Sequence, residues 1–132
     1  MGIGRSENMR RIRSKDTTPE VAVRQLIRGL EFTGYRLHRK DLPGKPDIAF
    51  IGRRKAIFVH GCFWHGHDCK EGARRPKSNA DYWVPKIENN ARRDAAHVAD
   101  LLAGGWSVLI VWECELRDTA ELARRLARFL RA

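Results

Sequence analysis

FVHGCFWHGHDC, at residues 58–69, is the stretch around which the rest of the sequence is organised. It follows an apolar run and holds three histidines, two cysteines, one acid and two adjacent aromatic residues. These residue types can ligate metal ions, transfer protons and stack on bases. Each of these functions needs further residues from elsewhere in the chain.

Length and charge narrow the possible partners. A chain of 132 residues can bury one hydrophobic core and is too short for two independent ones. It has 26 Lys+Arg against 16 Asp+Glu, a formal net charge of +10. This balance favours nucleic acid as the partner, because neutralising phosphates releases condensed counterions. A solubility charge on a small enzyme is the alternative interpretation.

Cysteine use and apolar patterning indicate the compartment. Three cysteines cannot form a complete disulfide framework, and no N-terminal apolar segment resembles a signal peptide. The longest apolar stretch, at 107–112, is far shorter than the roughly 20 residues that span a bilayer. We therefore expect a protein of a reducing cytoplasm that does not insert into membranes.

The N-terminal part divides into an arm and a helix. Residues 1–15 are basic and weakly patterned, which predicts a mobile arm ahead of a single domain over residues 16–132. A threonine cap, a proline and Glu20 then mark a helix start, and Gly34 is the predicted end. In this interpretation Glu20 compensates the positive end of the helix dipole.

A hairpin follows. A short strand is predicted over 35–38 and a loop over 41–46. Two antiparallel strands are predicted over 48–51 and 56–59, joined by a turn over 52–55 that includes Lys55. Asp47 stands at the beginning of one hairpin strand and His60 just after the other. Antiparallel pairing should therefore bring Asp47 and His60 to the same end of the ribbon.

The C-terminal half alternates helix and strand. A long helix should open at Tyr82 and close before Gly104, and residues 106–112 read as a central strand buried on both faces. Asp118 and Glu121 form an N-cap box for a final amphipathic helix. The predicted fold class is α/β, with one mixed sheet flanked by helices.

A structural metal site is one interpretation of the cysteines. Cys62, His67, Cys69 and the distant Cys114 supply three thiols and one imidazole, which suits tetrahedral Zn²⁺. His65 and Asp68 are competing ligands that spacing does not exclude. The alternative is that Cys62 and Cys114 pack in the core while Cys69 is a surface thiol.

Asp47, His60 and His65 form a second constellation. A carboxylate at a strand mouth is a hard oxygen ligand for Mg²⁺, and a neutral imidazole nearby can accept a proton from water at pH 7. Together they would support metal-assisted phosphodiester hydrolysis. The alternative makes His60 or His65 a ligand of an open catalytic zinc.

Four motifs carry a resemblance to a known family. They are RSENMR at residues 5–10, LPGKPD at 42–47, HGCFWH at 60–65, and GW at 105–106 followed by VLIVWEC at 108–114. Over nearly its whole length the chain resembles the very short patch repair endonucleases, which nick one strand at T:G mismatches. The resemblance implies a restriction-endonuclease-like core of the PD-(D/E)xK superfamily.

Site roles follow from this resemblance. Asp47 would hold Mg²⁺ with the backbone carbonyl of Val59, while His60 and His65 replace the usual acid-x-lysine element and His65 acts as general base. Glu20 and Asp94 match acidic residues near the family's active site. The same comparison assigns the structural zinc to Cys62, His67, Cys69 and Cys114.

The resemblance also implies how DNA is engaged. Phe63, Trp64 and Trp83 match aromatic residues that wedge into the duplex beside the mismatch, where a wobble pair is easily unstacked. The expected activity is Mg²⁺-dependent hydrolysis 5′ to the mismatched thymine. The expected partners are duplex DNA with a T:G mismatch and, in addition, repair proteins or a cognate cytosine methyltransferase system. A monomer suffices for a nick.

Two other functions remain open at this point. A related nuclease could accompany a restriction-modification system and cut another deformed or modified site. A catalytically silent, zinc-stapled DNA-binding module would bind DNA without cutting it.

Overall fold

The computed structural model describes residues 17–63, 65, 67, 69 and 80–132. The predicted N-terminal arm and most of the stretch between 64 and 79 lie outside these residues. The elements, in chain order, are α2 (Thr18–Gly29), β1 (Arg36–Leu37), β2 (Ile48–Phe50), β3 (Lys55–His60), α3 (Ala80–Ala103), β4 (Ser107–Trp112), a 3₁₀ helix η1 (Glu113–Arg117) and α4 (Thr119–Arg131). The predicted order of helices and strands is confirmed.

The strands form one mixed sheet in the order β1-β2-β3-β4. β1 pairs antiparallel with β2, β2 antiparallel with β3, and β3 parallel with β4. The expectation that the strand near 106–112 is central was wrong, because β4 is the last strand of the described sheet. Its alternating exposure shows that only Leu109 and Val111 are buried in it. The continuous apolar run in the sequence therefore predicted more burial for β4 than the structure shows.

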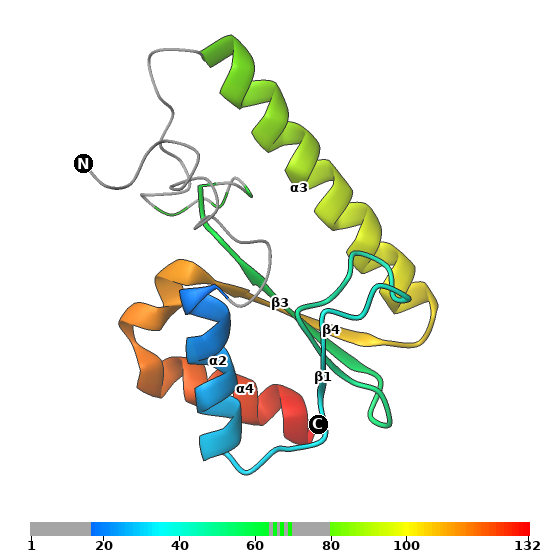
Figure 1. The fold of residues 1–132 in the computed structure, drawn as a ribbon, viewed down its shortest axis with the longest axis vertical. Coiled ribbons are helices and arrows are strands. Elements are labelled where there is room, and N and C mark those ends of the chain that lie inside the picture. Colours follow the sequence, from blue (N-terminus) through cyan, green and yellow to red (C-terminus); the bar gives the residue numbers. More distant parts are fainter. Residues whose placement is uncertain (1–16, 64, 66, 68, 70–79) are drawn as a thin grey trace, which may run out of the picture.

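The helices form layers on both faces of the sheet (Figure 1). α2 and α4 lie side by side on one face, and α3 crosses the other face beside β4. Alternation along β3 feeds both layers. Ile57 packs with Val23 and Ile27 of α2, whereas Ala56 and Phe58 pack with Leu101 of α3. The mixed α/β architecture predicted from the sequence is confirmed. In the part of the chain that is described, no helix is both long and apolar enough to cross a bilayer.

α2 begins as predicted but ends earlier. The side chain of Thr17 accepts a hydrogen bond from the Glu20 N–H at 3.4 Å. At the other end, Glu31 adopts φ 68°, and the N–H groups of Glu31 and Phe32 bond back to the carbonyls of Arg28 and Ile27. This is a Schellman ending with a glutamate in the left-handed position that glycine usually takes. Gly34 was therefore the wrong signal for the helix end.

α4 is held at both ends. The Asp118 carboxylate accepts from the Glu121 N–H at 3.1 Å, which confirms the predicted cap. At the C-terminal end, Lys55 Nζ donates to the Phe129 carbonyl at 2.5 Å, and Arg53 donates to the Leu130 carbonyl at 3.0 Å. These cations satisfy last-turn carbonyls and complement the negative end of the dipole. The β2–β3 turn thus anchors a helix that lies more than 70 residues further along the chain.

Candidate active site and metal centre

Glu20, His38 and Asp47 form a group that we call the acidic trio, near the C-terminal end of β3. Their potential ligand atoms lie within 4.8 Å of one another. Asp47 leaves the 41–46 loop and accepts a hydrogen bond from the Val59 N–H through Oδ2 at 2.7 Å. Glu20 comes from the first turn of α2, and its Oε2 lies 2.9 Å from His38 Nε2. Three segments distant in sequence therefore meet here.

Burial governs the charge state of Asp47 in the acidic trio. Burial raises the pKa of Asp47 to about 7, opposed by the hydrogen bond from the Val59 N–H and reinforced by the negative charge of Glu20. Glu20 is only 4% exposed. Two carboxylates in such a site repel each other, so a cation is the ligand that would stabilise both in their ionised form.

His60, His65 and Asp94 form the second group, the histidine trio. His65 Nδ1 lies 2.5 Å from Asp94 Oδ2, and His60 Nδ1 lies 3.9 Å from the same oxygen. The two imidazole rings stack with centroids 3.9 Å apart and planes 3° from parallel. His60 Nδ1 is buried and has no hydrogen-bond partner among the described residues. A buried polar atom left unpaired in this way is a mark of a site built for something else to bind.

The protonation of this trio follows from its surroundings. Burial lowers the pKa of His60 to about 4, and the charge of His65 acts in the same direction. The negative charge of Asp94 raises this pKa but does not outweigh the other two effects. His60 is therefore neutral at pH 7. Burial of Asp94 disfavours its charge, but the hydrogen bond and charge of His65 leave its pKa below the usual range. An ionised Asp94 can only accept a hydrogen bond, so His65 Nδ1 carries the proton. In a neutral ring with this tautomer, His65 Nε2 carries no proton and can accept one.

The two trios meet at β3. The sequence predicted one constellation of Asp47, His60 and His65, and the structure divides its members between the two groups. They remain close because Asp47 is bonded to the backbone of Val59, the residue next to His60. The hairpin register pairs Ile48 with Ile57. It therefore places Asp47 of the acidic trio and His60 of the histidine trio at the same end of the ribbon, as predicted.

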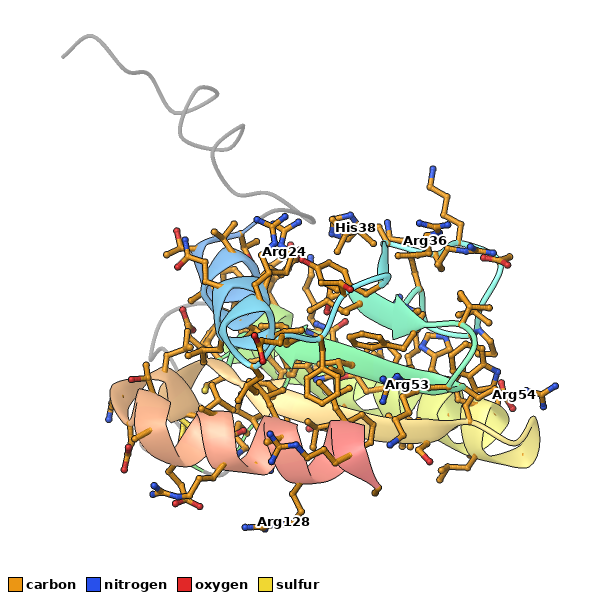
Figure 2. The ribbon with its side chains drawn as sticks, turned by 90° about the horizontal axis from the view of Figure 1, so that it is seen from below. Arg24, Arg36, His38, Arg53, Arg54 and Arg128 are labelled. Atoms are coloured by element: carbon orange, nitrogen blue, oxygen red, sulfur yellow. The ribbon has the colours of Figure 1, made fainter. Side chains whose placement is uncertain are left out.

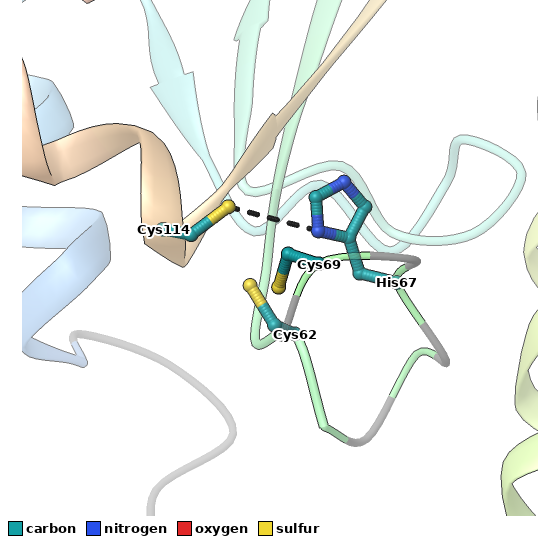
Figure 3. Close-up of side chains that lie close together, drawn as sticks. All are labelled: Cys62, His67, Cys69 and Cys114. Atoms are coloured by element: carbon teal, nitrogen blue, oxygen red, sulfur yellow. Dashed lines mark hydrogen bonds between the residues drawn. The ribbon is translucent and has the colours of Figure 1, made fainter. Parts of the chain in front are cut away.

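Cys62, His67, Cys69 and Cys114 form a third group, the sulfur cluster. All four point toward a common centre (Figure 3), and their potential ligand atoms lie within 4.8 Å of one another. Cys114 Sγ is 3.6 Å from His67 Nδ1. Burial raises the pKa of Cys62 to about 12, and burial likewise raises that of Cys114. With raised pKa values these thiols stay protonated at neutral pH, and they would bind a metal ion by losing their protons. The donor set therefore fits an ion that favours thiolate ligands.

The competing ligands for this cluster can be compared with the structure. His65 is paired with Asp94 instead, and Asp68 lies outside the described residues. The cluster joins the loop after β3 to η1, since Cys114 is the second residue of that 3₁₀ helix. The His67 ring also stacks on Trp112 at 4.1 Å, which links the sulfur cluster to β4.

Two of the three predicted wedge residues, Phe63 and Trp83, meet near the start of α3. Phe63 and Trp83 meet edge to face with centroids 6.0 Å apart, and Tyr82 packs against Trp83 at 4.9 Å. Trp64 lies outside the described residues. Tyr82 was not among the predicted site residues, although it is 57% exposed beside this pair.

A pocket of about 740 Å³ opens between α3 and β4. The histidine trio and His67 supply its polar wall, and its apolar wall includes Val98, Leu102, Ile110 and Trp112. The pocket gives solvent and ligands access to the histidine trio.

Sequence reasoning missed two histidines. His38 was read only as the end of a strand, yet it contacts Glu20 and has φ 49°. His97 packs against the loop that delivers Asp47, because a Cβ at Gly44 (φ 75°) would lie 2.7 Å from the His97 Cβ. The glycine in LPGKPD was a signal for this close approach, but nothing in the sequence named the partner.

Comparisons with known proteins extend over most of the chain. A family model described as DNA mismatch endonuclease Vsr matches residues 3–71. The Type II nicking enzyme V.XorIIP of Xanthomonas oryzae pv. oryzae is 55% identical over 122 residues, which cover 92% of this chain and 88% of that protein. The Type II nicking enzyme V.NmeAIP of Neisseria meningitidis is 44% identical, over 96% of this chain and 89% of the relative. The DNA mismatch endonuclease Vsr of Escherichia coli is 41% identical, over 89% and 74%.

Proposed function

The chain belongs to the Vsr family of DNA mismatch endonucleases, and from this membership we propose that it nicks one strand of duplex DNA at a T:G mismatch, 5′ to the mismatched thymine, by Mg²⁺-dependent hydrolysis. The observation that carries the proposal is the meeting of two chemically different trios at one end of β3. One offers carboxylates to a hard cation, and the other offers an imidazole oriented by a carboxylate.

Asp47 is the proposed centre of the metal site. Its donor set fits, because the site combines the buried carboxylate of Glu20 with the half-buried carboxylate of Asp47, and carboxylate oxygens are ligands that Mg²⁺ favours. The Val59 carbonyl is the proposed backbone ligand. When bound, the ion supplies Lewis-acid stabilisation of the charge that develops on the phosphodiester. The negative charge of Glu20, in the same acidic trio, would favour binding of that cation.

His65 is the proposed general base. Its Nδ1–H donates to Asp94, which fixes the tautomer and aims Nε2 away from the carboxylate. An imidazole so oriented can remove a proton from an attacking water at neutral pH. His60 stacks on the His65 ring and limits its rotation. Because His60 stays neutral, its proposed role is to position His65 and to hydrogen bond the substrate.

The surface around the acidic trio supports DNA as the substrate. Figure 2 shows Arg24 and Arg36 along the same edge of the molecule as His38. Arg36 is exposed and Arg24 is half-buried. Arginines on the same edge as a carboxylate-lined site attract the phosphate backbone and partly offset its repulsion by the acids. Phe63, Trp64 and Trp83 are the proposed wedge, and the edge-to-face contact of Phe63 with Trp83 places two of these rings together.

The remaining assignments are structural. We assign the sulfur cluster to Zn²⁺, which would fasten the His65-bearing loop to η1. The sheet and its helices are proposed to be a restriction-endonuclease-like core, formed by one domain over residues 16–132, with residues 1–15 as an arm that folds against DNA. Family membership favours an active endonuclease over the silent DNA-binding module.

A second candidate activity rests on the relatives' names. Two of them are named Type II nicking enzymes, without mention of a mismatch. The alternative is therefore nicking of another deformed or modified site, in company with a restriction-modification system.

The test is nicking of end-labelled duplexes that carry one T:G mismatch in varied flanking sequences, with matched duplexes as controls and with Mg²⁺ present or absent. We expect Mg²⁺-dependent cutting of the thymine strand alone, 5′ to the thymine. Cutting of a matched or methylated duplex in preference to every T:G duplex would replace the mismatch assignment with the second candidate.

A further inference from the structure

His38 stands out because the acidic trio pairs two carboxylates with one imidazole. The side chains of His38 and Glu20 are 13% and 5% exposed, so their contact is shielded from bulk water. The backbone also ties His38 to the site, since its N–H donates to the Asp47 carbonyl at 3.2 Å. His38 is thus fixed to both carboxylate residues, to one through its side chain and to the other through its main chain.

The spacing of these atoms suits a shared ion. Two neighbouring ligands that each lie about 2.1 Å from a metal and subtend a right angle are about 3 Å apart. His38 Nε2 and Glu20 Oε2 are 2.9 Å apart, and every ligand atom of the trio lies within 4.8 Å of the others. Little movement is therefore needed to convert the Glu20–His38 hydrogen bond into a pair of ligands.

The donor types indicate which ion. Mg²⁺ favours oxygen ligands and water, whereas imidazole nitrogen favours first-row transition ions. Lys45 also acts on Asp47 through its charge. The Lys45 ammonium group can balance the charge of the carboxylates, but it cannot coordinate the His38 imidazole nitrogen as a metal ion can. A set of two carboxylates and one imidazole is therefore better matched to a transition ion than to Mg²⁺ alone.

We infer that His38 is a metal ligand, and that the acidic trio binds a divalent transition ion of the Mn²⁺ type through the imidazole together with the carboxylates of Glu20 and Asp47. The inference rests on the proposed function, because Asp47 is shared with the proposed Mg²⁺ site. It adds that this site distinguishes Mn²⁺ from Mg²⁺ and that His38 is the cause.

Mn²⁺ itself is the probe. The full-length protein is first loaded with one equivalent of Zn²⁺, which the thiolates of the sulfur cluster favour over Mn²⁺, and excess Zn²⁺ is removed so that it does not occupy the acidic trio. Mn²⁺ is then added below stoichiometry, and nitrogen coupling to the bound ion is read by electron spin-echo envelope modulation. Mn²⁺ affinity is measured by the loss of the free-ion EPR signal, and Mg²⁺ affinity by competition. The variants are His38→Gln, Asp47→Asn and, as a matched control, His97→Gln.

We expect a nitrogen signal in the wild-type protein and in His97→Gln, and its loss in His38→Gln. His38→Gln should weaken Mn²⁺ binding about tenfold or more, with a smaller change for Mg²⁺. A melting curve checks that each variant is folded. A nitrogen signal that persists in His38→Gln, or bound Mn²⁺ without such a signal in the wild type, would overturn the inference and reduce His38 to a partner of Glu20.

The same experiment separates this inference from the proposed function. If Asp47→Asn loses both ions while His38→Gln binds them as the wild type does, the Asp47 site stands and the role of His38 falls. If Asp47→Asn binds Mn²⁺ and Mg²⁺ as tightly as the wild type, the proposed metal site falls together with the inference.

Discussion

The two ends of β3 each bury a titratable side chain, with opposite consequences. Lys55, at the first position, is 7% exposed, and His60, at the last, is 6% exposed. Lys55 Nζ donates two hydrogen bonds, to the main-chain oxygens of Phe129 at 2.5 Å and Ala132 at 2.6 Å, near the end of α4. His60 keeps a buried Nδ1 that no described group satisfies.

This difference indicates that the Lys55 end of β3 contributes to stability and the His60 end to the reaction. A buried cation that donates to main-chain oxygens is costly to disturb, because its removal leaves those oxygens without their donor. A buried imidazole without one lowers stability and is retained where a ligand or a reaction uses it. We therefore expect substitutions at the Lys55 end to change melting temperature and those at the His60 end to change nicking.

The largest effect is expected for Asp47→Asn. The amide oxygen can still accept the Val59 N–H, so the fold should be kept, while the anionic metal ligand is lost. Nicking should fall by about 10³-fold or more, because metal stabilisation of the developing charge contributes several kcal/mol. Single-turnover nicking and a gel-shift assay measure the change, with duplex binding expected to be largely intact. An unfolded variant would mean that Asp47 is mainly structural.

His65→Ala should have the next largest effect. Removing a general base costs about 10²-fold or more. Imidazole added to the buffer should restore part of the lost rate, because the deleted ring leaves room beside Asp94, whereas a purely structural defect would not respond. The measurement is the nicking rate against imidazole concentration. A rate close to that of the wild type without imidazole would remove His65 from the chemistry.

Cys114→Ala tests the sulfur cluster at the same end of the sheet. Loss of one of four ligands should lower zinc content and melting temperature together, since metal binding contributes directly to folding. Ser107→Ala, on the exposed face of β4, is the control and should change stability by less than about 0.5 kcal/mol. Metal analysis and thermal melts follow both variants. Unchanged zinc stoichiometry in Cys114→Ala would contradict the assignment.

Lys55→Met should have the smallest effect on chemistry and a moderate one on stability. Methionine keeps the apolar stem against Phe129 but leaves the α4 carbonyls without their donor. The expected loss is about 1–3 kcal/mol, or roughly 5–10 °C in melting temperature for a domain of this size. Differential scanning calorimetry gives the shift. A melting temperature equal to that of the wild type would show that water replaces the ammonium without cost.

The parts of the fold that depend on local signals were predictable. Caps at Thr17 and Asp118 depend on residues within one helical turn, and both are present. The sulfur cluster was predictable as well, because three thiols and one imidazole are one of the donor sets that tetrahedral zinc sites use, and the chain has three cysteines in all. Placing Asp47 and His60 at the same end needed only the hairpin register.

Contacts between distant segments were not predictable in the same way. Lys55 was read as part of a turn, because its partners on α4 lie more than 70 positions away. His38 gave no periodic or motif signal, and its contact with Glu20 exists only once β1 and α2 are packed. The edge position of β4 was missed for a related reason, since an apolar run shows that a strand is partly buried but not how many neighbours it has.

The most direct test of the account compares the two ends of β3 in one experiment. Single-turnover nicking of a T:G duplex is measured for the wild type, Asp47→Asn and Lys55→Met under saturating Mg²⁺, well below the melting temperature of each. The account predicts that Lys55→Met cuts at the wild-type rate per folded molecule while Asp47→Asn is slower by about 10³-fold. Equal losses in the two variants, or full activity in Asp47→Asn, would contradict it.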